Sequence, residues 1–293
     1  MKVLITGATG FLGSHLVDWL LNRGHTVYAI IHPNSDYHFS RNTKNLYPIR
    51  MNLRELDEAK LPSDIDALYT LAQSRKFRQF PETAQDIFEV NVVSHFALWE
   101  WARKSNVPSV IHASSGGIYG MSDNQNALKE DHLVTVNPDL GFYLSTKLCS
   151  ETILQNYKPY FKSLILLRPF FLFGPGQQND MLVARLIHSI KNSLPISLQG
   201  TEGMTFNPVA INDATEAFGC ALEISGHHVI NVAGAEIFSL KSFCTKISSI
   251  VGKQALFIQT PGTPANYLAC TDKMKTLLGV SPTSIQRVLE NMI

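Results

Sequence analysis

The fold is decided by the stretch Val3-Leu4-Ile5-Thr6-Gly7-Ala8-Thr9-Gly10-Phe11-Leu12-Gly13 near the start of the chain. Its first residues predict a buried strand, and its glycines predict a turn that leads into an amphipathic helix. Gly7 permits a tight turn, Gly10 removes the Cβ that would hold a pyrophosphate away, and Gly13 lets the helix pack close to the strand. The helix N-terminus, with Phe11 and Leu12, then offers free N–H groups to a phosphate. An ordinary turn and core helix without a ligand is the alternative.

Apolar segments alternate with helical patterns through the first 170 residues. This alternation predicts an α/β fold with a Rossmann-type doubly wound parallel sheet, whose ligands collect at the carboxyl edge of the strands. From Gly174 on, shorter and less regular elements predict a smaller mixed α/β C-terminal substrate lobe. We therefore expect a dinucleotide-binding domain at 1–170 and a substrate-binding lobe at 171–293, a division that leaves room for the chain to interleave between the two. The expected strands after the first are Thr26–Ile31, Tyr47–Met51, Ala67–Ala72, Ser109–Ala113 and Leu164–Arg168.

A long helical pattern runs from Pro81 to about Ser105. Its apolar residues are expected to form one stripe that packs on the sheet. The stripe consists of Ile87, Val90, Val93, Ala97, Leu98 and Trp101.

The composition is that of an ordinary soluble globular protein, with 45% hydrophobic residues, 17% charged residues and a formal net charge of +1 over 293 residues. No run of Lys and Arg is long enough to follow a phosphate backbone, so nucleic acid is not an expected partner. The first strand starts directly after Met1, and no apolar run approaches membrane-spanning length, which predicts a cytoplasmic protein without a membrane partner. The dispersed cysteines predict neither a metal site nor a redox pair. They are Cys149, Cys220, Cys244 and Cys270.

Tyr143 and Lys147 are expected to carry the chemistry. On a helix, their four-residue spacing puts the phenol and the ammonium on the same face. The ammonium stabilises the phenolate, which lets Tyr143 exchange a proton near neutral pH. Ser115 follows the fifth expected strand, at the edge where a cofactor binds, and its hydroxyl can hydrogen-bond the reacting oxygen. An ordinary helix pair is the alternative for Tyr143 and Lys147 taken alone.

With these pieces in place, the chain resembles the extended short-chain dehydrogenase/reductase family, of the NAD-dependent epimerase/dehydratase type that acts on nucleotide sugars. The resemblance spans nearly the whole chain and implies a Rossmann domain, a tightly held nicotinamide cofactor, a C-terminal substrate lobe and a homodimer. The further matching segments are Leu71-Ala72, Asn91, Leu167-Arg168-Pro169, Phe173-Gly174-Pro175-Gly176, Ile211-Asn212-Asp213, Lys273 and Leu278-Gly279-Val280-Ser281-Pro282. The expected cofactor contacts, besides the glycine turn, Tyr143 and Lys147, are His32, Asn34, Ser35, Asn52, Leu53, Leu71, Ala72, Asn91 and Pro169.

Departures from the family pattern bear on the substrate. Phe171 stands where many members place an Asn against the diphosphate of the sugar nucleotide, and Phe206 or Asn207 stands where they place an Arg. Arg75 matches a basic residue near the active site of some epimerases, although a solvated loop charge is an equal alternative. The residues expected to contact the substrate are Arg75, Ser115, Phe171 and Phe206.

These features favour an NAD(P)-dependent oxidoreductase, most simply a ketoreductase or C4 epimerase of a nucleotide-activated sugar. Gly116-Gly117 follow Ser115 where members that eliminate water usually carry Asp-Glu, which disfavours a dehydratase. The modest length and the small C-terminal lobe favour a 4-ketoreductase over a 4-epimerase. Two alternatives are a reductase of a non-sugar carbonyl compound and a non-catalytic NAD(P)-binding sensor or scaffold protein.

The end of the second expected strand favours NADP over NAD. NAD-specific members place an acidic residue there, which accepts hydrogen bonds from the adenosine ribose and repels a 2′-phosphate. The matching position here is Ile31. The alternatives are that Asp36 serves the ribose or that neither cofactor is discriminated. The donors expected for a 2′-phosphate are His32, Asn34, Ser35 and Arg41.

Overall fold

The computed structural model describes residues 1–35, 39, 44–120, 126–134 and 138–293, in which the chain forms two compact units. The chain passes between the units more than once, so neither unit is a continuous segment. The expected division of roles at residue 170, between cofactor binding and substrate binding, stays a prediction. Unit 1 consists of Met1–Ile118, Val136–Arg168 and Thr215–Ile230, and unit 2 consists of Tyr119–Thr135, Pro169–Ala214 and Asn231–Ile293.

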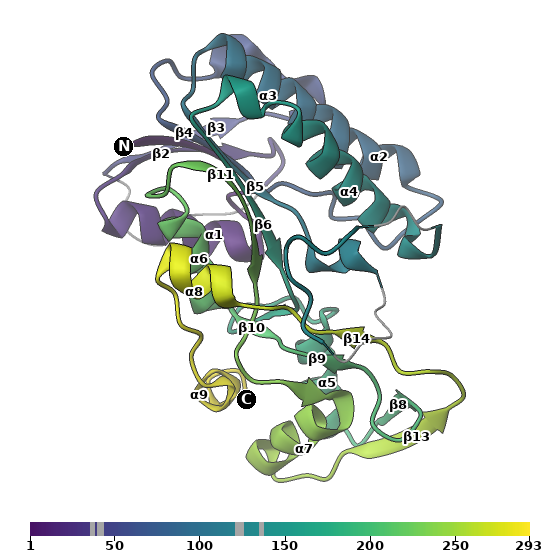
Figure 1. Ribbon diagram of the computed structural model, residues 1–293. Coiled ribbons are helices and arrows are strands. Elements are labelled where there is room, and N and C mark those ends of the chain that lie inside the picture. The colour runs from purple at the N-terminus through teal and green to yellow at the C-terminus, as the bar shows by residue number, and fades with distance from the viewer. Residues whose placement is uncertain (36–38, 40–43, 121–125, 135–137) are drawn as a thin grey trace. The chain divides into compact units, whose positions relative to one another are not determined.

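A seven-stranded sheet dominates unit 1 (Figure 1), with the strand order β11-β6-β5-β4-β1-β2-β3. β1 pairs in parallel with β2 on one side and with β4 on the other, so the order of the strands reverses at this point. The arrangement confirms the predicted Rossmann-type doubly wound sheet, in which ligands bind where the order reverses. The strands are β1 Lys2–Thr6, β2 Thr26–Ile31, β3 Leu46–Arg50, β4 Ala67–Thr70, β5 Ser109–Ala113, β6 Ser163–Pro169 and β11 Gly226–Val232.

Helices cover both faces of this sheet. α2, α3 and α4 lie over one face, and α1 and α6 lie over the other (Figure 1). The Tyr69 hydroxyl donates to the Phe218 carbonyl oxygen at 2.9 Å and so ties β4 to α6. Gly219 allows α1 and α6 to approach, because a Cβ there would lie 2.4 Å from the Trp19 ring. The helices are α1 Phe11–Asn22, α2 Ala84–Phe88, α3 Ser94–Lys104, α4 Gly141–Gln155 and α6 Ile211–Cys220.

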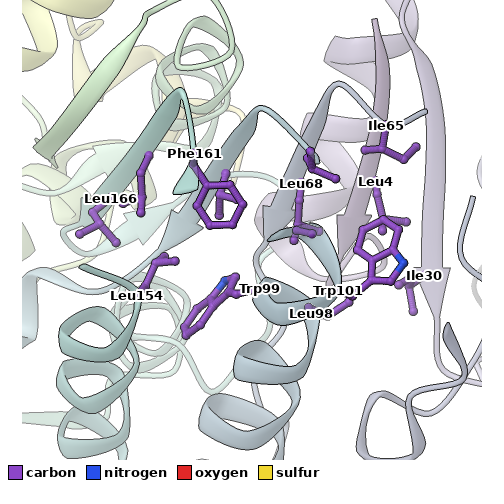
Figure 2. Close-up of a cluster of buried hydrophobic side chains, with 14 of the residues drawn as sticks. Leu4, Ile30, Ile65, Leu68, Leu98, Trp99, Trp101, Leu154, Phe161 and Leu166 are labelled. Atoms are coloured by element: carbon purple, nitrogen blue, oxygen red, sulfur yellow. The ribbon is translucent and has the colours of Figure 1, made fainter. Parts of the chain in front are cut away.

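The core beneath α3 and α4 is built from large apolar side chains (Figure 2). Trp99 and Trp101 of α3 are buried in one cluster with Leu4, Leu68 and Leu154. Fully burying a side chain of this kind stabilises the fold by about 1.5 to 3 kcal/mol. The cluster therefore fastens both helices to the sheet and fixes the position of α4.

The long helical pattern between Pro81 and Ser105 is interrupted. α2 is followed by a π-helical turn at Glu89–Val93, and α3 begins only after it. A π-helical turn takes in more residues than an α-helical turn, so it shifts the phase of every side chain that follows. For this reason the predicted apolar stripe is wrong at Val93, which is 48% exposed, whereas Asn91 is fully buried.

Unit 2 contains shorter elements around a second apolar core, as the predicted mixed α/β lobe requires. Phe173, Phe206 and Phe243 are fully buried at its centre. Many of its strands have only two residues, a length that hydrophobic periodicity does not reveal. None of the helices in the described ranges has the length and apolar character needed to cross a bilayer. The elements are β7 Leu172–Phe173, α5 Leu182–Lys191, β8 Pro195–Gln199, β9 Thr205–Phe206, β10 Val209–Ala210, β12 Phe238–Ser239, α7 Leu240–Val251, β13 Leu256–Thr260, β14 Asn266–Tyr267, α8 Asp272–Leu278 and α9 Ile285–Glu290.

Candidate active site

The glycine turn between β1 and α1 depends on the absence of side chains. Gly7 has a φ of +69°, in the left-handed region, and its carbonyl oxygen accepts from the Gly10 N–H at 2.9 Å. A Cβ on Gly13 would lie 2.0 Å from the Gly7 carbonyl oxygen, and a Cβ on Gly7 would lie 2.8 Å from the Ala72 nitrogen. Close packing of the turn against α1 and the end of β4 therefore accounts for Gly7 and Gly13.

Gly10 and the start of α1 fit a phosphate group. No side chain caps this helix, so its first N–H groups are left for another acceptor. Gly10 is exposed, and a Cβ there would meet only the Gly7 carbonyl oxygen, at 3.1 Å. A side chain at Gly10 would instead fill the space before the helix N-terminus, where the N–H groups of Phe11 and Leu12 attract an anion.

The end of β4 lies beside this turn. Thr6 Oγ1 accepts from the N–H groups of Leu71 and Ala72 at 3.2 and 3.3 Å. These bonds bring two expected cofactor contacts to the edge of the sheet where Gly7 lies. Because both N–H groups already have an acceptor, Leu71 and Ala72 can offer a cofactor their side chains and carbonyl oxygens.

Tyr143 lies in the first turn of α4. Its hydroxyl donates to Gln73 Oε1 at 2.8 Å, and the Phe77 ring packs on its ring with the centroids 4.8 Å apart. Burial raises the pKa of Tyr143, whereas the positive charge of Arg78 lowers it. In this arrangement the loop after β4 holds the phenol in its protonated form.

Lys147 follows one turn later and is only 2% exposed. Its Nζ donates to the Ala113 carbonyl oxygen at 3.0 Å, at the carboxyl end of β5. Burial lowers the pKa of Lys147 to about 8, so the amine remains largely charged at neutral pH. The structure thus places the phenol and the ammonium on one helix at the ligand edge of the sheet.

The loop after β5 brings Ser115 to the same helix. The Oγ of Ser115 accepts from the Gly117 N–H at 3.1 Å. A Cβ on Gly117 would lie 2.8 Å from Leu144 Cδ2 and 3.4 Å from Ser115 Oγ, so this glycine contacts both. Ser115 therefore lies on a loop of unit 1 that contacts the helix carrying Tyr143 and Lys147.

Asn91 is fully buried and uses both ends of its amide within the protein. Oδ1 accepts from the Ser74 N–H and Nδ2 donates to Thr146 Oγ1, each at 2.9 Å. Its carbonyl oxygen accepts from the Ser150 hydroxyl. Asn91 thus fastens the loop after β4 to α4, and its expected contact with the cofactor stays a prediction.

The residues expected at the adenosine ribose follow β2. His32 Nδ1 accepts from the Asn34 N–H at 3.2 Å. Arg50 Nη1 donates to the carbonyl oxygens of Pro33 at 2.8 Å and Ser35 at 3.2 Å. Arg50 therefore holds the backbone of the described part of this loop together.

Asn52 and Leu53 begin a short 3-10 turn. Asn52 Oδ1 accepts from the Arg54 N–H at 3.2 Å, and its Nδ2 donates to Glu55 Oε1 at 3.0 Å, so this side chain closes its own turn. Leu53 packs against the core of unit 1. Two residues considered for cofactor discrimination lie outside the described residues, namely Asp36 and Arg41.

The other predicted substrate contacts differ in their surroundings. Phe171 has a φ of +42°, which strains a bulky residue. Its ring lies 5.1 Å from that of Phe206, and Phe206 is fully buried in the core of unit 2, without free surface for a substrate. Pro169 ends β6, and Arg75 is exposed on the loop after β4 of unit 1.

The sequence pattern does not single out Gln73, Thr146 or the Ala113 carbonyl oxygen. The available signal for Gln73 is its place as a polar residue just beyond a strand at the ligand edge. A backbone carbonyl carries no such signal, because every residue has one. The contacts that orient the two predicted catalytic side chains, Tyr143 and Lys147, are therefore visible only in the structure.

Comparison with known proteins finds relatives along the whole chain. The model of the NAD dependent epimerase/dehydratase family matches residues 3–233. An uncharacterized UDP-glucose epimerase of Bacillus subtilis (strain 168) is 30% identical, covering 100% of this chain and 97% of the relative. A UDP-glucuronic acid 4-epimerase from Bacillus cereus, crystallised with UDP-glucuronic acid and NAD, is 30% identical with a TM-score of 0.84, covering 99% of this chain and 97% of that chain. A dTDP-4-dehydro-6-deoxyglucose reductase of Escherichia coli is 26% identical, covering 87% of this chain and 83% of the relative.

The solved structures correct the expected cofactor. The prediction that NADP is favoured over NAD is wrong, because the similar epimerase structures hold NAD. Ile31 removes the repulsion of a 2′-phosphate, but it supplies no attraction in its place. Arg50, a cation described near this loop, already donates to two backbone carbonyl oxygens.

The family model covers the glycine turn, the Ser115 loop and α4 in one continuous match. The resemblance seen in the sequence, and the prediction of an enzyme, are confirmed by it. This chain belongs to the NAD dependent epimerase/dehydratase family.

Proposed function

We propose that the chain is an NAD-dependent 4-epimerase of a nucleoside-diphosphate sugar. The observation that carries the proposal is the placement of Tyr143 and Lys147 one turn apart on α4, with the Ser115 loop in contact with the same helix. We prefer epimerisation to simple ketone reduction because both relatives with 30% identity described above are named as epimerases.

The chain's own residues suit NAD. The glycine turn and the start of α1 would hold its pyrophosphate, since Gly10 leaves the helix N-terminus open to an anion. When bound, NAD supplies the acceptor and donor of the hydride. Lys147 brings a positive charge to the same edge of the sheet.

Tyr143 moves the proton in this proposal. As a phenolate, it takes the proton of the sugar C4 hydroxyl while that carbon is oxidised to a ketone, and it returns the proton when the ketone is reduced from the opposite face. The Lys147 ammonium stabilises the phenolate, and the Ser115 hydroxyl donates to the reacting oxygen. The family's dehydration chemistry is disfavoured, because Gly116 and Gly117 offer no carboxylate after Ser115.

The recognition of the diphosphate has to differ from the common family pattern. Phe171 stands at the position of one polar anchor, and Phe206 or Asn207 stands at the position of the other. The two phenylalanines belong to an aromatic cluster of unit 2. Arg75 is an exposed cation on the loop after β4, and we assign it to the anionic part of the substrate.

A 4-ketoreductase is the second candidate. The similarity to the Escherichia coli dTDP-4-dehydro-6-deoxyglucose reductase favours it. The same three side chains serve this reaction, with Tyr143 donating a proton to a ketone that is reduced once. The two candidates differ in whether the cofactor is consumed.

We also propose that the enzyme is a cytoplasmic homodimer. Phe88, Val93 and Phe96 are 44% to 48% exposed along the helical run from α2 to α3, an apolar surface that a second copy would cover. All four cysteines are free thiols, as is usual in a reducing compartment. Phe96→Glu should convert the dimer to a monomer in light scattering, and a wild-type protein of monomer mass would contradict the proposal.

The function is tested with purified protein, NAD and either UDP-glucose or UDP-glucuronic acid, followed by chromatographic separation of the C4 epimers. Epimer formation without net cofactor consumption supports the epimerase, whereas stoichiometric oxidation of NADH by a 4-keto sugar supports the ketoreductase. A bound ligand at about 100 times its Kd adds roughly 2.7 kcal/mol of stability. If no nucleoside-diphosphate sugar gives either turnover or a thermal shift, both candidate functions are overturned.

A further inference from the structure

Gln73 accepts a hydrogen bond from the phenol of Tyr143, yet the proposed chemistry gives Gln73 no role. Tyr143 Oη donates to Gln73 Oε1 at 2.8 Å. The residues on either side, Ala72 and Ser74, are buried, and their N–H groups are bonded to buried side chains at 3.3 and 2.9 Å. The backbone beneath the Gln73 amide is therefore fixed, and the amide itself is exposed.

This hydrogen bond favours the protonated phenol. An amide oxygen can only accept, so ionisation of Tyr143 has to break the bond. Phe77 covers the phenol ring, and burial raises the pKa of Tyr143 in the same direction. The positive charge of Arg78, which lies 4.7 Å over the Phe77 ring, opposes this effect and lowers the pKa of Tyr143.

We propose that Gln73 is a positioning residue that favours the protonated form of Tyr143 until bound substrate displaces the amide. The phenol, no longer held by Gln73, then releases its proton to water and becomes the phenolate that the oxidation step requires. The inference rests on the proposed function, because the replacing group is the hydroxyl or ketone oxygen of the reacting carbon. In the oxidation step the C4 hydroxyl donates to the phenolate in place of the amide contact, so the exchange leaves no buried polar group unpaired. Gln73 thereby favours the protonated form of Tyr143 in the absence of substrate.

The test compares the pH dependence of turnover in wild type, Gln73→Glu and Gln73→Met. In Gln73→Glu a carboxylate opposes the phenolate, so the limb that reports Tyr143 ionisation should move up by about one pH unit, with about a tenfold loss of rate below that limb. In Gln73→Met the acceptor is absent, so the limb should move down. Gln79→Glu is the matched control, because it puts the same charge on an exposed position of the same loop and should leave the profile unchanged.

A readout without substrate separates this inference from the proposed function. The ultraviolet absorbance of tyrosinate in NAD-loaded protein, after subtraction of the Tyr143→Phe signal, isolates the titration of Tyr143. A shift upward in Gln73→Glu and downward in Gln73→Met supports the role of Gln73, even if no sugar nucleotide is converted. Titrations and pH profiles that coincide in wild type, Gln73→Glu and Gln79→Glu would overturn it, even in an active epimerase.

Discussion

Lys147 donates from its buried ammonium to the carbonyl oxygen of Ala113, at 3.0 Å. The contact joins α4 to the end of β5, but it keeps a charge away from water. Burial lowers the pKa of Lys147 from 10.5 to about 8. The protein therefore retains the amine at a cost in stability, which a binding partner with negative charge would reduce.

This cost has a predictable pH dependence. Between pH 8 and 10.5 the unfolded chain binds the lysine proton and the folded protein does not, so the Lys147 contribution makes the folded state more stable as pH rises. From pH 7.5 to 9.5 we expect this contribution to be about 2 kcal/mol in wild type and absent in Lys147→Met. Urea unfolding at both pH values measures it. The same pH response in both proteins would show that the lysine is not perturbed.

Tyr143→Phe should lower turnover by about 10²- to 10⁴-fold, the usual contribution of a positioned proton donor. The affinity for NAD should change little, since the hydroxyl bonds to Gln73 in the protein without ligands. The matched control is Tyr157→Phe, whose hydroxyl donates to Glu100 Oε1 at 2.6 Å. Steady-state rates and NADH fluorescence titrations give both quantities, and a fully active Tyr143→Phe would rule out the mechanism.

Glu151 of α4 and Arg168 of β6 form an ion pair with 1% and 5% side-chain exposure. Removing one partner leaves a buried charge, so Glu151→Ala should reduce the free energy of unfolding by about 3 to 5 kcal/mol. Lys60→Ala, which breaks an exposed pair with Asp57, should cost less than about 1 kcal/mol. Denaturant titration compares the two variants, and equal losses would refute the difference assigned to burial.

Gly10 and Gly13 should respond differently to alanine. Gly13→Ala places a Cβ 2.0 Å from the Gly7 carbonyl oxygen, so it should lower the melting temperature and impair NAD binding together. Gly10→Ala meets only one atom, at 3.1 Å, so it should keep most of the stability while weakening NAD binding. Thermal melts and NADH titrations distinguish these outcomes. Unchanged NAD affinity in a folded Gly10→Ala protein would argue against the phosphate site.

NADH should bind more tightly than NADPH at matched ionic strength. Arg50 is bonded to the carbonyl oxygens of Pro33 and Ser35, so a 2′-phosphate would have to compete with the loop backbone for this cation. Fluorescence titration with both reduced cofactors measures the ratio. Tighter binding of NADPH would mean that the loop rearranges around a phosphate.

The features that the sequence predicts well are those set within one segment. The glycine turn and the Tyr143 and Lys147 pair depend on spacing along a strand, a turn or a helix, so the pattern determines them. The bond between Gln73 and Tyr143 joins residues 70 positions apart, and only the packing of α4 on the sheet brings them together. No periodicity contains that information.

Two other differences between the sequence-based predictions and the structure have local causes that a hydropathy pattern does not contain. The π-helical turn around Asn91 is held by hydrogen bonds to Ser74, Thr146 and Ser150, so polar contacts rather than apolar spacing set the phase of the helix. Phe206 has the hydrophobicity of a pocket residue and of a core residue alike, and the structure assigns it to the core. In both cases the hydrophobicity of the sequence does not determine which side chains are buried, and the packing of the folded protein does.

The interleaved path of the chain has a consequence for synthesis on the ribosome. β6 is followed by the first long segment of unit 2, and its neighbour β11 emerges only later. Until then β6 is an unpaired edge with open N–H and C=O groups, which readily pair with other chains. The nascent protein is therefore vulnerable to misassociation at β6 until β11 has been synthesised, and a pause in translation between these two strands would prolong that exposure.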